Sequence, residues 1–205
     1  YVTALKKGYT ASSLLVDTPT VFPGGVNQPD YEPVNYDSKY RGPVQVRFAL
    51  GNSINVPAVK ILAKVGVRDM LSTAYDMGLK TLEPTKDNLS RFGLSVTLGG
   101  GEVRLLEMVN AYSAFANGGN RFEPTAILKV EDNKGKVLEE TKEQKGRRVL
   151  QEGEAFIISD ILSDNNARAE VFGPRSALVV AGRTVAVKTG TTNDRRDNWT
   201  IGGNK

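Results

Sequence analysis

Residues 185–199 read VAVKTGTTNDRRDNW, and the short apolar run that opens this stretch predicts a β-strand ending in Lys-Thr-Gly-Thr. Side chains alternate between the two faces of a strand, so Lys188 and Gly190 share one face. Thr189 and Thr191 are then expected on the opposite face, unless the strand twists. Gly190 has no Cβ, so the backbone of a ligand could lie against this strand. Taken alone, however, Lys-Thr-Gly is more typical of an edge strand that ends in polar turn residues.

The composition restricts the chemistry that this strand end could serve. The 205 residues contain no His and no Cys, which excludes a Ser-His-Asp triad, a thiol nucleophile and thiolate metal ligands. A nucleophilic mechanism must therefore use Ser or Thr, activated by Lys or by a carboxylate. A phosphate-binding P-loop is excluded as well, because that motif needs Gly before the Lys and Val187 stands there.

The net charge of +4 raises the question of an acidic partner such as nucleic acid or a membrane surface. The basic residues are dispersed along the chain and are not interleaved with aromatic side chains. The densest basic cluster, residues 134–148, also contains Glu139, Glu140 and Glu143. We therefore expect a solvated charged surface and no nucleic-acid partner.

Hydrophobic periodicity and turn residues predict one α+β domain over residues 1–205. Residues 46–120 are expected to be mainly helical, with Pro57 near a helix start and Gly78 at a helix end. Residues 150–164 predict another amphipathic helix. The last helix before residue 120 is expected to have an apolar face made of Leu105, Met108, Val109, Tyr112, Phe115 and Ala116.

The remaining segments are predicted to be extended or irregular. Residues 17–45 contain repeated prolines and are expected to form a long loop. Residues 121–140 predict a β-hairpin with its turn at 132–135. Residues 177–205 predict the strands of a sheet, the first of them at 177–180.

Ser53 and Asn55 lie two residues apart in the stretch GNSINVP, directly before the helix predicted at Pro57. Ser and Asn are frequent helix N-caps, so capping is the simpler interpretation of this pair when it is taken alone. A catalytic interpretation needs a hydroxyl that can pass a proton and an amide that can bind a carbonyl. Both interpretations are open at this point.

Ser-x-Asn followed by a strand-borne Lys-Thr-Gly forms two of the three sequence elements of penicillin-binding enzymes. Three longer stretches extend the match: SINVPAVKIL, GGGEVRLLEMVNAYSAFANGGNRFEPTAILKV and AVKTGTTNDRRDNW. Each resembles the transpeptidase domain of class A penicillin-binding proteins, and together they follow the family order over nearly the whole chain. The resemblance implies the penicillin-binding and β-lactamase-like fold, an antiparallel sheet with a helical subdomain.

The resemblance also implies a D,D-transpeptidase that cross-links peptidoglycan stem peptides. In that family a serine attacks the D-Ala-D-Ala amide, D-Ala leaves, and an amine of a neighbouring stem peptide takes the acyl group. β-Lactams acylate the same serine, and no cofactor or metal is implied. The parent protein is then expected at the extracytoplasmic face of the bacterial cell membrane, anchored there and joined to a glycosyltransferase domain.

Roles for individual residues follow from the same resemblance. Ser53 and Lys188 are implied as the proton-relay pair toward the leaving group. Asn55 is implied to orient the donor peptide. The hydroxyls of Thr189 and Thr191 are implied to bind the substrate carboxylate. The backbone N–H of Thr191 is implied to form half of an oxyanion hole. The implied substrate-binding residues are Thr189, Gly190 and Thr191.

The third family element, Ser-x-x-Lys, is absent from the 205 residues, and the only Ser or Thr with this spacing is Thr3 before Lys6. In the family pattern this element precedes a Tyr-x-x-Ala-Leu helix turn, which residues 1–5 match. We therefore expect the chain to begin just after the catalytic serine and to be inactive alone. The family continues from the position of Trp199 with Trp-Phe-x-Gly-Tyr-Thr-Pro and a further strand, so a truncation is expected at this end too. Gly203 stands where the family has Tyr, so the role of the last residues stays open.

Two other functions are compatible with the sequence. One is a non-catalytic relative that binds cell-wall peptides without acylation, which the absence of Ser-x-x-Lys from the parent gene would indicate. The other is a basic nucleic-acid-binding module, which a salt-dependent affinity for DNA or RNA would indicate. No apolar run reaches the roughly 18 residues of a membrane-spanning helix.

Overall fold

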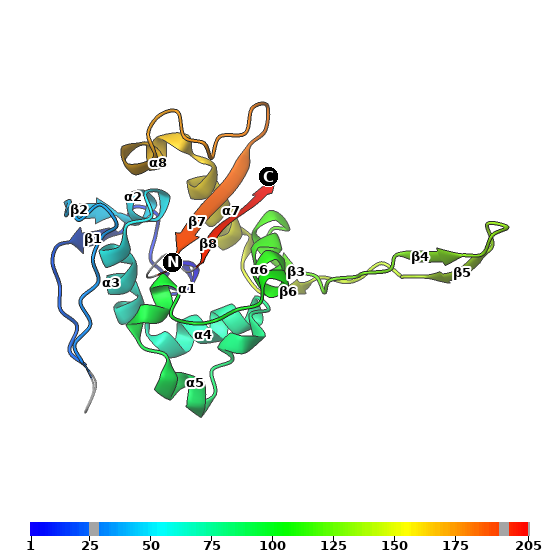
Figure 1. Ribbon diagram of the computed structural model, residues 1–205, viewed down its shortest axis with the longest axis horizontal. Helices are drawn as coiled ribbons and strands as arrows, with labels where there is room; N and C mark the ends of the chain where they lie inside the picture. Colours follow the sequence, from blue (N-terminus) through cyan, green and yellow to red (C-terminus); the bar gives the residue numbers. More distant parts are fainter. Residues whose placement is uncertain (25–28, 193–196, 205) are drawn as a thin grey trace.

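The structure is a computed structural model that describes residues 1–24, 29–192 and 197–204. Part of the predicted loop at 17–45, the middle of the stretch quoted first, and Lys205 lie outside these ranges. The described residues form helices and antiparallel strands, which confirms the α+β class. A mainly helical body carries one long two-stranded sheet, and a hairpin extends away from it (Figure 1).

The helices expected before residue 120 and at 150–164 are present, and local signals mark the ends of several of them. Helix α4 ends just before Gly78, whose φ of +109° is a conformation that glycine adopts easily. Helix α7 begins with a capping box formed by Gln151 and Glu154. The helices are α1 (Val2–Lys6), α2 (Val46–Gly51), α3 (Asn55–Val65), α4 (Val67–Asp76), η1 (Lys80–Leu82), α5 (Lys86–Arg91), η2 (Leu94–Leu98), α6 (Leu105–Ala116), α7 (Glu152–Ser163) and α8 (Asn165–Phe172).

Each sheet in the described part of the chain has two antiparallel strands. In the longest pair, Lys188 lies opposite Ile201 and Gly190 opposite Trp199. The pairs are β1 (Leu14–Asp17) with β2 (Gly42–Gln45), β3 (Asn120–Arg121) with β6 (Arg147–Arg148), β4 (Lys129–Glu131) with β5 (Val137–Glu140), and β7 (Val185–Thr191) with β8 (Asn198–Asn204).

Apolar packing places the end of α2 next to β7. One buried cluster joins α2 to α7, and Ala186 of β7 packs against it; its members are Leu50, Ile158, Ile161 and Leu162. A second cluster joins α2 to α1, α3 and the β1–β2 sheet; its members are Ala4, Leu15, Val44, Val46, Ala49, Ile61, Leu62 and Val65. Because α2 belongs to both clusters, its C-terminal end is held at the junction of α3, α7 and β7.

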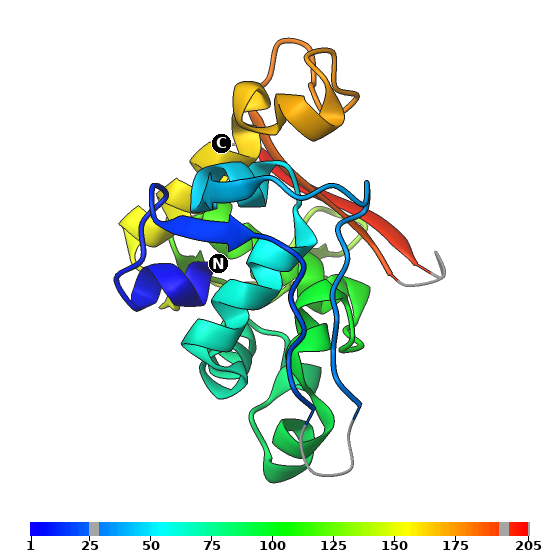
Figure 2. The same cartoon turned by 90° about the vertical axis from the view of Figure 1, so that its left-hand side faces the viewer.

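The loop at 17–45 is more ordered than expected. Its ends form the β1–β2 pair, and an isolated bridge between Phe22 and Tyr31 brings its two arms together (Figure 2). The remainder of the described loop is irregular, in agreement with its prolines.

Helix α6 buries a different set of side chains from the expected one. Ala111 and Ala114 are buried, and Phe115 packs against the core beside them. Leu105 and Val109, both expected on the apolar face, are 59% and 50% exposed. The prediction for these two residues is wrong, because α6 approaches the core through its small alanines.

Two features of residues 165–184 also differ from the prediction. Residues 177–180 form turns and irregular backbone, so the strand expected there is absent and β7 starts only at Val185. Helix α8 was not expected, because it has little apolar periodicity. Its one buried side chain is Arg168, whose guanidinium donates to the Leu162 carbonyl at 2.9 Å.

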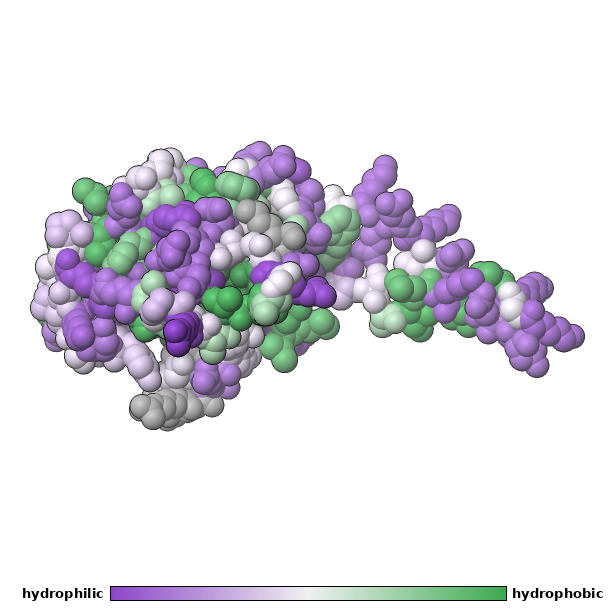
Figure 3. All heavy atoms as spheres, turned by 90° about the horizontal axis from the view of Figure 1, so that it is seen from above, coloured by the Kyte–Doolittle hydropathy of each residue, from purple (hydrophilic) through white to green (hydrophobic). Residues whose placement is uncertain are grey.

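The predicted hairpin is confirmed, with β4 and β5 as its strands. Asp132 makes the expected turn, since its Oδ1 accepts from the N–H groups of Lys134 at 2.8 Å and Lys136 at 3.0 Å. All four residues of β5 are exposed. The hairpin forms an arm on which hydrophilic and hydrophobic side chains are mixed (Figure 3).

Candidate active site

Ser53 lies in the turn just after α2, two residues beyond Gly51, and has a left-handed backbone conformation with a φ of +56°. The N–H of Ile54 donates to the Ala49 carbonyl at 2.9 Å, and the N–H of Ser53 donates to the Leu50 carbonyl at 3.1 Å. These two bonds form a Schellman motif, whose left-handed position is usually glycine. A serine in this conformation costs on the order of 1 kcal/mol, and such strain is concentrated at functional sites.

The structure contradicts helix capping as the role of Ser53 and Asn55. The N-cap residue of α3 is Ile54, and no side-chain hydrogen bond is made from it. Asn55 is the first helical residue, and its Nδ2 donates to the Val34 carbonyl at 2.8 Å. The N–H of Val56 donates to Oδ1 of Asn35 at 3.0 Å. The start of α3 is thus held by contacts with the distant loop rather than by N-capping from Ser53 or Asn55.

The other side of the turn is fixed to α8. The Nδ2 of Asn52 donates to the Ala167 carbonyl at 2.8 Å, and its Oδ1 accepts from the N–H of Val171 at 3.0 Å. A Cβ on Gly51 would lie 2.9 Å from the Ala167 carbonyl oxygen. Only glycine at this position therefore allows α2 and α8 to approach so closely.

Lys188 reaches the turn from β7. Its Nζ donates to Oγ of Ser53 at 2.6 Å and to the Thr189 carbonyl at 2.6 Å. The expected proximity of Ser53 and Lys188 is therefore confirmed. Burial lowers the pKa of Lys188 from 10.5 to about 8, because desolvation disfavours the ammonium form. The pair combines a hydroxyl with a lysine that can gain or lose a proton near neutral pH.

A cavity of about 370 Å³ opens beside this pair, and Ser53, Asn55 and Lys188 all line it. Tyr1 and Thr97 line it too, although their sequence context gave no signal for this. Within the described ranges, Tyr1 Oη and Thr97 Oγ1 are buried and have no hydrogen-bond partner. Buried polar atoms are usually paired, so these two could bind a polar group that enters the cavity.

The other three predicted site residues lie along β7, outside the lining of this cavity. Thr189 is half-buried, and Gly190 and Thr191 are exposed. Apart from the chain neighbours of Gly190, no described residue has an atom within 4 Å of the place where a Cβ on Gly190 would lie. Among the described residues the strand is therefore open on this side, which leaves room for an extended ligand backbone.

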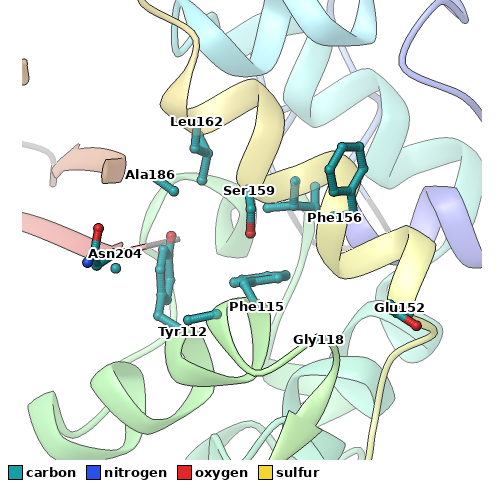
Figure 4. A pocket seen from close by; sticks show the side chains of 12 residues that line it. Tyr112, Phe115, Gly118, Glu152, Phe156, Ser159, Leu162, Ala186 and Asn204 are labelled. Carbon is teal, nitrogen blue, oxygen red and sulfur yellow. The ribbon is translucent and has the colours of Figure 1, made fainter. Parts of the chain in front are cut away.

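A second cavity, of about 170 Å³, lies between α6, α7 and the long sheet (Figure 4). The rings of Tyr112 and Phe115 meet edge to face there, with 5.6 Å between their centroids. Ser159 of α7 and Ala186 of β7 also line it. Its described lining contains no lysine, so it lacks the hydroxyl–lysine pair of the larger cavity.

Sequence patterns missed the buried amides of Asn35 and Asn52. Asn35 lies in a segment that was expected to be an irregular loop, and its contact with Val56 spans 21 residues. Asn52 contacts Ala167 across 115 residues. No local motif marks such contacts, because an amide that bonds a distant backbone has the same sequence signature as one in a turn.

Comparisons with known proteins extend these observations to the whole chain. A family model described as "Penicillin binding protein transpeptidase domain" matches residues 2–200. Penicillin-binding protein 1A of Aquifex aeolicus is 37% identical over 98% of this chain and 26% of its own length. Penicillin-binding protein 1A of Neisseria lactamica is 34% identical over 100% of this chain and 25% of its own length.

The solved structures include a match to the same kind of protein. The crystal structure of penicillin-binding protein 1A from Haemophilus influenzae superposes with a TM-score of 0.82 and 25% sequence identity. The match covers 98% of this chain and 34% of that one. Of the two curated relatives named above, this chain spans about a quarter of the length.

Within the described ranges, no helix has both the length and the apolar character needed to cross a membrane. The family match extends over almost all of the chain and includes both the Ser53 turn and the Lys188 strand. The observed α+β architecture is the one that the resemblance implied. The chain belongs to the family of penicillin-binding protein transpeptidase domains.

Proposed function

We propose that this chain supplies part of the active site of a peptidoglycan D,D-transpeptidase, in which Ser53 and Lys188 relay a proton to the leaving group. The observation that carries this proposal is the 2.6 Å hydrogen bond between Lys188 Nζ and Ser53 Oγ at the wall of a cavity. Membership of a transpeptidase family supports the reaction type.

The direction of this hydrogen bond agrees with a relay. A lysine ammonium can only donate, so Oγ of Ser53 accepts from it. The hydroxyl hydrogen is then available for a leaving amine in the cavity. As the hydroxyl gives up its proton, Oγ takes one from Nζ and leaves a neutral amine. Burial favours that neutral form, which is why the pKa of Lys188 is lowered to about 8.

Asn55 and the exposed end of β7 are proposed to hold the stem peptide. Asn55 orients the donor peptide from the rim of the cavity. The hydroxyls of Thr189 and Thr191 bind the substrate carboxylate, and the Thr191 N–H stabilises the oxyanion. Among the described residues the space beside Gly190 is open, so the peptide backbone can lie along the strand on the face that Lys188 shares.

The attacking serine is proposed to belong to a Ser-x-x-Lys element outside the 205 residues, since none of their serines has a lysine three positions later. The isolated chain is then not acylated by a β-lactam, because hydrogen-bond donors without a nucleophile form no covalent intermediate. The substrates of the whole protein are peptidoglycan stem peptides. We place the whole protein at the extracytoplasmic face of the bacterial membrane, anchored and joined to a glycosyltransferase domain.

The test is covalent labelling of the full-length protein with a fluorescent penicillin, followed by mapping of the modified residue by mass spectrometry. The proposal predicts one label, on the serine of a Ser-x-x-Lys element, and none on the isolated chain. Binding of a D-Ala-D-Ala peptide without any label would indicate a non-catalytic peptide-binding protein instead. Labelling of Ser53 or Thr3 in the isolated chain would contradict an external nucleophile.

A further inference from the structure

Asn35 is a buried amide, 4% exposed, whose polar atoms join three segments of the chain. Its Nδ2 donates to Oδ1 of Asp17 in β1 at 2.8 Å and to the carbonyl of Lys39 at 2.7 Å. Its Oδ1 accepts from the N–H of Val56 in α3 at 3.0 Å. The side chain therefore connects the β1–β2 sheet to the first turn of α3.

The first turn of α3 depends on this contact for its capping. A helix begins with N–H groups that have no partner in the helix, and a polar N-cap side chain usually accepts one of them. Here the N-cap residue is Ile54, whose side chain cannot accept, and Pro57 has no N–H. Asn35 takes over the role from 21 residues away. The neighbouring Val34 carbonyl adds a bond from Asn55 Nδ2.

The loop that carries Asn35 is itself anchored. Asp17 is fully buried, and its Oδ2 accepts from the backbone N–H of Arg41 at 3.0 Å. The guanidinium of Arg41 pairs with Asp37 at 2.6 Å and with Glu170 of α8 at 2.5 Å. Asn35 is thus held by a carboxylate that cannot move into solvent and by a loop tied to a second helix.

Ser53 needs such support, because a left-handed serine persists only where its surroundings fix it. Asn52 holds the turn on the α2 side, and Asn35 holds it on the α3 side. We propose that Asn35 is a positioning residue: by capping α3 from a distance, it keeps Ser53 Oγ within reach of Lys188 Nζ and fixes the amide of Asn55. This inference rests on the proposed function, since it concerns the proton relay.

The test compares two acyl donors with the full-length protein and its Asn35→Ala variant. The ring nitrogen of a β-lactam needs a proton as it leaves, whereas the thiolate of a thioester leaves without one. If Asn35 positions the relay, Asn35→Ala lowers acylation by the β-lactam about 10- to 100-fold, the size of effect expected for a small misplacement. Acylation by the thioester falls much less, so the ratio of the two rates changes.

A stability-matched control separates positioning from general destabilisation. Leu71 is fully buried in α4 and does not line the cavity of Ser53 and Lys188. Leu71→Ala, or Leu71→Val if its melting temperature is the closer match, lowers stability without touching the turn. At a temperature below both unfolding transitions this control should keep the wild-type rate ratio. Asn35→Ser, whose shorter side chain cannot span the same contacts, replaces Asn35→Ala if that variant does not fold.

A double exchange adds a rescue experiment. The exchange Asp17→Asn with Asn35→Asp keeps an amide–carboxylate pair in the interior and an oxygen acceptor for the Val56 N–H, but it places an oxygen against the Lys39 carbonyl, to which Asn35 Nδ2 donates. Recovery of part of the β-lactam acylation that Asn35→Ala loses would therefore support the cap. An Asn35 variant with a lower melting temperature and the wild-type rate ratio would overturn the inference. If the unmodified full-length protein is acylated by neither donor, the proposed function fails instead.

Discussion

The Nζ atom of Lys188 lies 2.6 Å from the Oγ atom of Ser53, although 135 residues separate them in the sequence. β7 carries the lysine, and the turn at the end of α2 carries the serine. The cluster that includes Leu50, with Ala186 packed against it, sets the spacing between these two elements. The contact is therefore a product of tertiary packing, and changes at several points should alter it in different ways.

Replacement of Ser53 by glycine should separate stability from activity. Glycine adopts a φ of +56° without strain, so Ser53→Gly should be roughly 1 kcal/mol more stable than Ser53→Ala, which keeps a Cβ. Both variants lack the hydroxyl, and β-lactam acylation of the full-length protein should fall about 10²- to 10⁴-fold in each. Denaturant unfolding and acylation kinetics measure the two effects. Equal stability would argue against strain, and a wild-type rate would remove Ser53 from the relay.

The rate of acylation should fall as the pH rises through about 8, the pKa of Lys188. In the proposed relay the ammonium form of the lysine donates the proton, and this form is lost above the pKa. Lys188→Arg keeps its charge to much higher pH, so it should lack this decline whatever its absolute rate. Rate–pH profiles of the wild type and the variant provide the measurement. A wild-type rate that stays constant across this range would contradict the role of the ammonium.

The same lowered pKa should affect folding stability. An unfolded lysine has a pKa of about 10.4, whereas Lys188 in the fold has one of about 8. Between these values the unfolded chain binds more protons, so the contribution of Lys188 to the free energy of unfolding rises with pH. The free energy of unfolding is measured against pH for the wild type and for Lys188→Met. The difference between the two curves should show this rise. A difference that falls or stays flat between these pKa values would contradict burial as the cause.

Gly51→Ala should weaken the attachment of α2 to α8. The added Cβ would lie 2.9 Å from the Ala167 carbonyl oxygen, so the backbone must shift, at a cost of about 1–3 kcal/mol. Gly153 in α7 is a matched control, since a Cβ there meets nothing within 4 Å. Gly153→Ala should leave stability unchanged or raise it by up to about 1 kcal/mol. Thermal denaturation of both variants measures the difference in stability. Equal losses of stability in the two variants would show that the contact with Ala167 does not cause the loss in Gly51→Ala.

If Thr191 binds the substrate carboxylate as proposed, Thr191→Ala should weaken that binding while it keeps the backbone N–H. Loss of one hydrogen bond to a charged group corresponds to about 1.5–3 kcal/mol, or roughly a 10- to 100-fold slower acylation by penicillin. Thr191 is exposed, so the melting temperature should hardly change. Acylation kinetics of the full-length variant are the measurement. An unchanged rate would exclude this hydroxyl from the carboxylate site.

Local signals in the sequence predicted the elements whose ends depend on a few neighbouring residues. Gly78 after α4 and the turn at Asp132 are examples, since each acts through its own backbone or the next few residues. The strand predicted at 177–180 is absent, because apolar residues alone do not distinguish a strand from an exposed turn. Likewise, periodicity assigned Leu105 to a face that the fold leaves exposed.

For the site, the sequence identified Ser53 and Lys188 as candidates, and their contact follows from packing over the whole chain. The left-handed turn at Ser53 could not be predicted, because serine is rare in this conformation and local preference argues against it. Asn35 and Asn52 were missed for a related reason: both amides bind backbone atoms of segments that are remote in sequence. The missing information is therefore tertiary rather than local.

The β4–β5 arm gives the molecule a position where foreign sequence can be added. Its strands bury no side chain, and its tip at Asp132 and Gly135 is a turn closed by its own hydrogen bonds. Exposed tips of this kind tolerate insertions and are preferred sites of proteolytic nicking. An epitope or a fluorescent peptide placed between Asn133 and Lys134 should therefore report on the protein in living cells, and a protease cut there should leave the Ser53–Lys188 contact intact.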